Sequence, residues 1–167
     1  VDNLYGSIVF NDYLKNRNFQ NPIIASPDIG GVARARSVAK ALGLDIVIVD
    51  KRREKANESE VMNVIGDVNG KDVILVDDMI DTGGTIVKAA RAFKDRGATS
   101  VIACCTHAVL SGKAYEILKE DALDELVVTD TIPLKEPSDK IKVLSVAPIF
   151  GEVIRRVYHN ESVNSLF

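Results

Sequence analysis

Short apolar segments alternate with amphipathic ones along the chain. Six of the apolar segments are rich in β-branched residues and carry few polar positions, which is typical of strands covered on both faces of a parallel sheet. The expected strands are residues 22–26, 44–50, 73–77, 100–105, 125–129 and 142–145.

Between these segments, apolar residues recur at helical spacing on three stripes. The stripes are Val32, Ala35, Val38, Ala39 and Leu42; then Ile86, Ala89, Ala90 and Phe93; then Ile149, Phe150, Val153, Ile154, Val157 and Tyr158. Gly43 and Gly97 follow the first two stripes and are typical helix ends. The alternation predicts an α/β fold, a doubly wound and mostly parallel sheet flanked by helices, as one domain over residues 1–167.

Two segments interrupt this alternation. The sequence DKRREKAN at 50–57 is polar and strongly basic, and it directly follows an expected strand. After it, EVMNVIGDVNGKDVILVD predicts an extended segment that turns at Asn69 and Gly70 into the strand at 73–77.

Composition narrows the class of protein. The chain has 167 residues, 46% apolar and 27% charged, which is typical of one globular domain. No apolar run approaches the roughly 20 residues of a membrane span, and the net charge of −3 argues against a general nucleic-acid binder. The adjacent Cys104 and Cys105 lie in an apolar run, so we expect core thiols and a reducing cytoplasm. The chain begins at Val1, which suggests processing or a longer parent chain.

The segment VILVDDMIDTGGT at 73–85 carries the most chemical information. A buried strand ends in Asp77 and Asp78, and a turn with two glycines and two threonines leads into a helix. Helix N-termini bind phosphate through free N–H groups, and glycine allows the backbone to approach the anion closely. The paired carboxylates repel phosphate, but they can accept hydrogen bonds from sugar hydroxyls or bind Mg²⁺. The segment therefore predicts a site for a phosphorylated polyol, with the phosphate in the turn.

The same segment resembles the ribose-phosphate loop shared by type I phosphoribosyltransferases and ribose-phosphate pyrophosphokinases. Other motifs are similar to the second family and extend the resemblance over essentially the whole chain. They are SPDIGGVARAR, DKRREKAN, EVMNVIG, CCTHAVLSG, ELVVTDTIP and ESVNSLF.

The resemblance implies a phosphoribosyltransferase-type fold and an enzyme that makes 5-phosphoribosyl 1-diphosphate (PRPP) from ribose 5-phosphate and Mg-ATP, releasing AMP. Members of the family contain two tandem domains, and this chain resembles the second. The first domain supplies much of the ATP site, so the isolated chain is expected to be inactive. The family also implies a cytoplasmic homo-oligomer, a hexamer in the full-length enzyme.

The resemblance assigns roles to particular residues. Asp28 would be a Mg²⁺ ligand, although an Asp at this position can equally cap the helix that follows. Lys51 and Arg53 would stabilise the transferring phosphates, with Arg52 a bystander; the alternative is a solvated basic loop.

The phosphate turn and the acid pair would hold the substrate. Asp77 and Asp78 would bind the 2- and 3-hydroxyls of ribose. The 5-phosphate would bind in the turn formed by Asp81, Thr82, Gly83, Gly84 and Thr85. Asp81 itself is expected to shape the turn by accepting backbone N–H groups.

Four further residues are weaker candidates. His107 follows a buried strand, and we expect a structural role for it. Ser162, Ser165 and Phe167 match a terminal segment that contributes to a regulatory nucleotide or phosphate site between subunits in some family members.

Two other functions remain open at this point. A phosphoribosyltransferase that consumes PRPP would need a nucleobase-binding hood, and the sequence has no aromatic-rich segment and no Trp for one. A non-catalytic subunit would be expected to lose the catalytic lysine or the acid pair, whereas Lys51, Arg53, Asp77 and Asp78 are all present.

Overall fold

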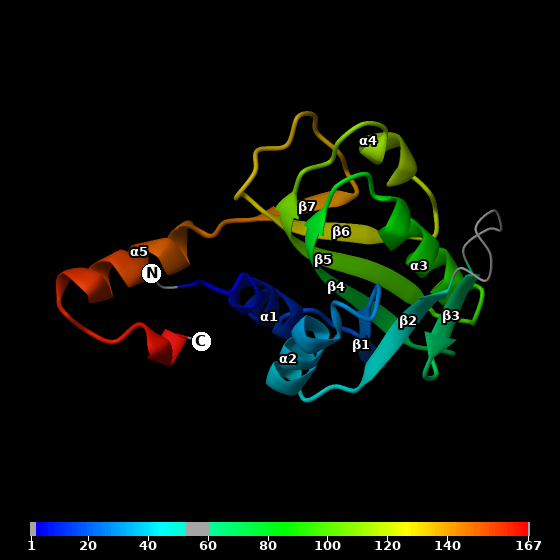
Figure 1. Ribbon diagram of the computed structural model, residues 1–167, viewed down its shortest axis with the longest axis horizontal. Coiled ribbons are helices and arrows are strands. Elements are labelled where there is room, and N and C mark those ends of the chain that lie inside the picture. Colours follow the sequence, from blue (N-terminus) through cyan, green and yellow to red (C-terminus); the bar gives the residue numbers. More distant parts are fainter. Residues whose placement is uncertain (1–2, 53–60, 167) are drawn as a thin grey trace.

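A seven-stranded sheet runs through the computed structural model (Figure 1), which describes residues 3–52 and 61–166. The strands are β1 Pro22–Ser26, β2 Ile46–Arg52, β3 Val61–Ile65, β4 Asp72–Ile80, β5 Ser100–Ala108, β6 Glu125–Thr129 and β7 Ile141–Leu144. Their order is β3-β2-β1-β4-β5-β6-β7, and every neighbouring pair is parallel except β2 and β3. The predicted doubly wound, mostly parallel α/β fold is confirmed.

Helices accompany this sheet, and the first four of them pack against its two faces. They are α1 Ser7–Lys15, α2 Val32–Leu42, α3 Gly84–Lys94, α4 Ala114–Ile117 and α5 Ala147–Tyr158, followed by the 3₁₀ helix Asn164–Leu166. Phe10 of α1 and Val38 of α2 share one core cluster with Ile74 of β4, whereas Phe93 of α3 shares the other with Leu75. Adjacent residues of β4 thus face different helix layers, which is why the strand is apolar almost throughout. Within the described residues, no helix is long and apolar enough to cross a membrane.

The extended segment after the basic motif is present as β3, and the chain turns from it into β4 as predicted. Strand β3 pairs antiparallel with β2, from Ile48 opposite Ile65 to Arg52 opposite Val61. Strand β4 lies between β1 and β5. The turn at Gly70 forms with φ of +67°, and the Gly70 N–H donates to the Gly97 carbonyl at 2.8 Å. Both edges of β4 are taken by parallel neighbours, so an antiparallel partner has no place there.

The two cysteines lie in the core, as expected. Cys104 and Cys105 of β5 are both free and fully buried. Burial raises the pKa of the Cys104 thiol far above its ordinary value and that of Cys105 to about 12. Neither thiol is activated for nucleophilic chemistry.

The last predicted helix is present, but its apolar stripe does not cover the sheet. No residue of α5 is buried, and Phe150, Ile154, Val157 and Tyr158 are exposed. Figure 1 shows α5, in orange, projecting beyond the sheet on the side of β7. Spacing alone predicted the helix; it could not show which surface the helix packs against.

Candidate active site

The candidate site lies where the strand order reverses, between β1 and β4. The chain leads from β1 into α2 on one face and from β4 into α3 on the other, and open α/β sheets bind ligands at such a crevice. Pairing of β1 with β4 ends at Ala25 opposite Leu75, but β4 continues beside β5 to Ile80. Asp77 and Asp78 therefore stand in the part of β4 that extends beyond its pairing with β1.

The turn after β4 leaves the N-terminus of α3 open to a ligand. Gly83 has φ of +79°, a conformation that other residues rarely adopt, and α3 begins at the next residue. In the described part of the chain, no side chain caps this helix, and its first turn carries no acidic residue. The N–H groups of the first turn and the helix dipole thus favour an anion.

A cavity of about 190 Å³ opens against this turn. It is lined by Asp28, Asp77, Met79, Ile80, Asp81, Thr82, Gly83, Thr85 and Ile86. The structure thus brings one acid of the pair, Asp28 and both threonines around a single space. Asp78 and Gly84 do not line it, although each adjoins a residue that does.

Asp81 shapes the turn in a different way from the one predicted. Its carboxylate Oδ1 accepts a hydrogen bond from the hydroxyl of Ser111, and its carbonyl accepts from the Ser111 N–H at 3.0 Å. The expected bonds to N–H groups of the turn itself are absent among the described residues. Asp81 instead ties the turn to the loop after β5.

The acid pair is held by an arginine that the sequence analysis did not single out. Arg34 of α2 donates from Nη1 to Asp77 Oδ1 at 2.9 Å and from Nη2 to Asp78 Oδ2 at 2.7 Å. Burial raises the pKa of Asp77 to about 6, although Arg34 opposes the shift. Burial acts in the same direction on Asp78, but the hydrogen bond with Asp77 and the charge of Arg34 hold its pKa below the ordinary value.

Among the described residues no side chain caps α2, so the helix cap that was weighed against metal binding for Asp28 is not formed. Asp28 Oδ1 accepts from the Gly31 N–H at 2.8 Å, just before α2 begins, and its carbonyl accepts from the Ser26 hydroxyl at 2.7 Å. The same residue lines the cavity at the phosphate turn. Asp28 therefore holds the turn before α2 and also faces the cavity. No group of three or more metal-ligating side chains occurs among residues 3–52 and 61–166.

The basic segment begins at the same edge of the sheet. Strand β2 extends two residues further than predicted, so Lys51 and Arg52 lie on its carboxyl end, opposite Met62 and Val61 of β3. Because β2, β1 and β4 are parallel, this end of β2 and the acid pair share one edge. Arg53 lies outside the described residues.

His107 faces a second cavity, of about 320 Å³, next to the acid pair. Arg34, Asp77, Asp78 and the segment before α1 also line this cavity. The His107 Nδ1 lies 3.0 Å from the Thr131 hydroxyl oxygen, and Thr131 donates to the Thr106 carbonyl at 3.0 Å. This chain of contacts ties β5 to the loop after β6, which agrees with the structural role expected for His107.

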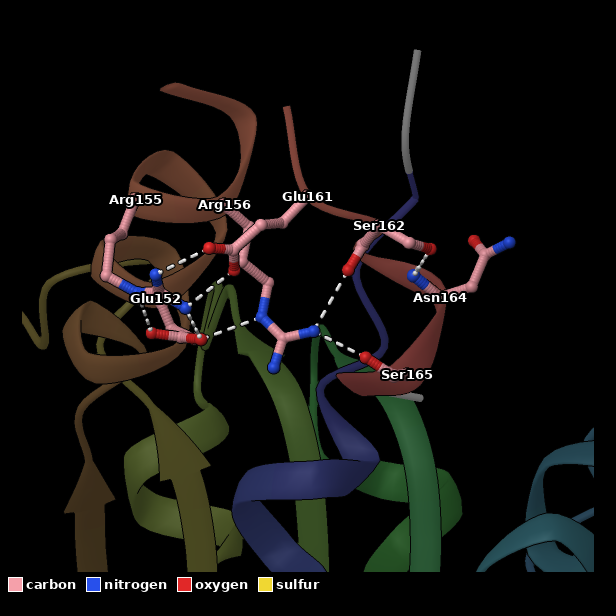
Figure 2. A network of polar contacts seen from close by, with 7 residues as sticks. All are labelled: Glu152, Arg155, Arg156, Glu161, Ser162, Asn164 and Ser165. Atoms are coloured by element: carbon pink, nitrogen blue, oxygen red, sulfur yellow. Dashed lines mark hydrogen bonds and ion pairs between the residues drawn. The ribbon is translucent and has the colours of Figure 1, made fainter. Parts of the chain in front are cut away.

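The candidate regulatory serines belong to a polar network of the C-terminal segment (Figure 2). Arg156 Nη1 donates to the Ser162 carbonyl at 2.9 Å and to the Ser165 hydroxyl. Arg156 also pairs with Glu152 at 2.7 Å. Phe167 lies outside the described residues.

A doubly wound sheet with a phosphate turn at its crevice is the architecture of phosphoribosyltransferase-type proteins. The adenine phosphoribosyl transferase of Trypanosoma brucei matches 87% of this chain and 75% of its own, with a TM-score of 0.57. Its identity of 23% supports the shared fold alone.

The chain belongs to the family of phosphoribosyl synthetase-associated domains, whose family model matches residues 52–167. It is 80% identical over 167 residues to a ribose-phosphate pyrophosphokinase of Campylobacter jejuni and 69% identical to one of Helicobacter pylori, covering 54% and 52% of their lengths. The phosphoribosylpyrophosphate synthetase of Mycobacterium smegmatis matches 96% of this chain and 53% of its own, with a TM-score of 0.86 and 37% identity. The resemblance to ribose-phosphate pyrophosphokinases is thereby confirmed, and the chain spans about half the length of these relatives.

Proposed function

We propose that this chain holds ribose 5-phosphate within a ribose-phosphate pyrophosphokinase, which makes PRPP from ribose 5-phosphate and ATP and releases AMP. One observation carries the proposal: a carboxylate of the acid pair and the uncapped N-terminus of α3 border the same cavity. A phosphate needs hydrogen-bond donors, such as the N–H groups of the helix, and sugar hydroxyls need acceptors, such as the carboxylate. A sugar phosphate carries both groups on one small molecule.

The substrate is oriented by its two ends. The 5-phosphate accepts hydrogen bonds from N–H groups at the start of α3 and from the hydroxyls of Thr82 and Thr85. The 2- and 3-hydroxyls donate to Asp77 and Asp78. With both ends fixed, the 1-hydroxyl is the free nucleophile, and its oxygen attacks the β-phosphorus of ATP while the bond to the α-phosphate oxygen breaks. Holding the nucleophile in one orientation is a large part of phosphoryl-transfer catalysis.

The basic segment is assigned to the transferring phosphates. Lys51 and Arg53 supply positive charge where negative charge accumulates during transfer. The position of Lys51 at the carboxyl end of β2, on the same sheet edge as the acid pair, supports this role. No general base is assigned among the described residues.

Asp28 is proposed to hold Mg²⁺ together with phosphate oxygens and water. A single half-buried carboxylate beside a phosphate-sized cavity fits an ion that keeps most of its water and substrate ligands. When bound, the ion neutralises phosphate charge and orients the phosphate groups. The hydrogen bond from the Gly31 N–H fixes the carboxylate in place for that purpose.

The organisation of the whole enzyme is also a proposal. A length of about half that of the relatives supports a second domain in the complete enzyme, with this chain as the later one. We further propose a cytoplasmic homohexamer, with Ser162, Ser165 and Phe167 in a regulatory site between subunits. The buried free thiols of Cys104 and Cys105 support a reducing compartment.

Substitutions in the basic segment test the assignment of catalysis. In the complete enzyme, Lys51→Ala should lower kcat for AMP formation at least about 10²-fold, the scale of losing one preorganised electrostatic group. The KM for ribose 5-phosphate should change little, because a different part of the site holds that substrate. The matched control is Lys55→Ala, which removes the same charge from the same basic segment and should be nearly silent.

Each alternative predicts a different result. Equally mild defects in both variants would show that the segment is only a charged surface. Absence of AMP formation by the unaltered enzyme, together with consumption of PRPP and a nucleobase, would replace the proposed reaction with phosphoribosyl transfer. The 167-residue chain alone is expected to bind ribose 5-phosphate without forming AMP.

A further inference from the structure

We propose that Arg34 is a positioning residue that holds Asp77 and Asp78 as a paired acceptor for the cis-diol of the sugar, and thereby selects ribose over deoxyribose. This inference rests on the proposed function, because it concerns how the same site recognises its sugar.

The guanidinium of Arg34 bridges the two carboxylates. Its two terminal nitrogens contact one oxygen of each acid, Asp77 Oδ1 at 2.9 Å and Asp78 Oδ2 at 2.7 Å. Asp77 Oδ1 also accepts from the Asp78 N–H at 2.9 Å. The planar fork of Arg fixes both the distance and the angle between its partners, which a lysine cannot do. The second oxygen of each carboxylate is then the one to accept a sugar hydroxyl.

The pair needs this counter-charge because of where it lies. Asp77 and Asp78 are adjacent in sequence, and their side chains are 19% and 60% exposed. Two carboxylates so close together repel, and burial of the first increases the cost of its charge. Arg34, 33% exposed, contacts both acids at once. The arginine therefore keeps two acceptors together that would otherwise separate or take up a proton.

The loop before α2 passes close to this arginine. A Cβ atom added at Gly31 would lie 2.8 Å from the Ser26 hydroxyl and 3.4 Å from Arg34 Nη1. Asp28, which accepts the Gly31 N–H, holds the same turn. Arg36, two residues further along α2, is exposed and forms no ion pair with Asp77 or Asp78, so the helix offers a matched arginine that does not reach the acids.

Two carboxylates that together accept two neighbouring hydroxyls can distinguish ribose from deoxyribose. A site whose acceptors are positioned for two hydroxyls disfavours an analogue that lacks one of them, because a partly desolvated acceptor is then left without that partner. 2-Deoxyribose 5-phosphate keeps the phosphate and the 3-hydroxyl but leaves one acceptor empty. The ratio of the affinities for the two sugar phosphates therefore measures the contribution of the acid pair. The affinity that both ligands retain measures the contribution of the phosphate turn.

The test compares the two sugar phosphates by titration calorimetry on the unaltered protein, Arg34→Gln and Arg36→Gln. The unaltered protein and Arg36→Gln should prefer ribose 5-phosphate at least about tenfold. In Arg34→Gln the preference should fall to within about threefold, mainly through weaker binding of ribose 5-phosphate. A merely structural role would weaken both ligands alike and leave the ratio unchanged, and that result would overturn the inference.

A second variant covers the case in which Arg34→Gln does not fold. Arg34→Lys retains the charge but cannot bridge two carboxylates in one plane, so its preference should lie between the other two. A fully retained preference in Arg34→Lys would also contradict the proposed bridge. Failure of the unaltered protein to bind ribose 5-phosphate would count against the proposed function itself, and is thereby distinguished from failure of the role of Arg34.

Discussion

Arginines hold carboxylates in two regions of the molecule, and the pKa values of Asp77 in one and Glu152 in the other shift in opposite directions. In the crevice between β1 and β4, Arg34 bridges Asp77 and Asp78, yet burial raises the pKa of Asp77 to about 6. In the C-terminal segment, Arg155 and Arg156 both contact Glu152 and lower its pKa to about 2 (Figure 2). The same pairing therefore has different consequences in the two environments.

The difference lies in what surrounds each pair. The crevice rests on a sheet whose two faces are packed with apolar side chains, so its charged groups lose water. No residue of α5 is buried, and its ion pairs are made in contact with solvent. Perturbed carboxylates in a cleft indicate a functional site, whereas well-solvated pairs shape a surface.

The largest expected effect is the difference between the two regions in their contribution to the free energy of unfolding. Phe93 of α3 is fully buried against the sheet, so Phe93→Ala should lower the free energy of unfolding by about 3–5 kcal/mol. The matched change Phe150→Ala, on the exposed face of α5, should cost less than about 1 kcal/mol. Urea denaturation followed by circular dichroism measures both. Equal losses would mean that α5 is part of the core.

A smaller effect concerns ligand binding at the phosphate turn. A Cβ added at Gly84 would meet only the Thr82 hydroxyl, at 4.0 Å, so Gly84→Val should fold. The side chain would obstruct approach of phosphate to the backbone, and affinity for ribose 5-phosphate should fall at least about tenfold. Calorimetry measures the affinity. In contrast, Gly83→Val should also destabilise the fold, because Gly83 has positive φ. Unchanged affinity in folded Gly84→Val would place the phosphate elsewhere.

The smallest effect is a pair of titrations. Carboxyl chemical shifts measured by NMR against pH should give a midpoint near 6 for Asp77 and near 2 for Glu152. Because the folded pKa of Asp77 lies above its ordinary 3.8, its contribution to stability is full below that value and is lost as pH rises toward 6. For Glu152 the sign is opposite: its contribution is present at neutral pH and is lost as pH falls through about 2. Coincident midpoints near 4 would remove the contrast between the regions.

Much of the fold could be predicted because its signals are local. The strands at 22–26 and 125–129 have the predicted bounds, and the stripe beginning at Val32 forms α2 up to Gly43. Pairing is not local, so the sequence did not show that β3 lies antiparallel beside β2. Helix α1 was missed, although Phe10 and Leu14 are buried and lie at helical spacing.

Most residues of the candidate site could be predicted from the sequence, but the contacts that link them to other segments could not. The acids, glycines and threonines of the phosphate turn follow from one continuous segment, and the structure gathers most of them around one cavity. Arg34 lies 43 positions before Asp77, and spacing along the chain does not show that they meet. The signal was a basic residue in the first turn of the helix after β1, at the same sheet edge as two adjacent acids. Asp81 was misjudged for a similar reason, because Ser111 belongs to another loop.

The central claim is that ribose 5-phosphate binds with its phosphate at the start of α3 and its diol at the acid pair. Titrating ¹⁵N-labelled protein with ribose 5-phosphate tests this claim directly by the movement of amide signals. The account predicts saturable shifts at Thr82, Gly83, Gly84 and Thr85, together with Asp77 and Asp78, whereas inorganic phosphate should move only the turn. Saturable shifts confined to other parts of the chain, with these six signals unmoved, would contradict it.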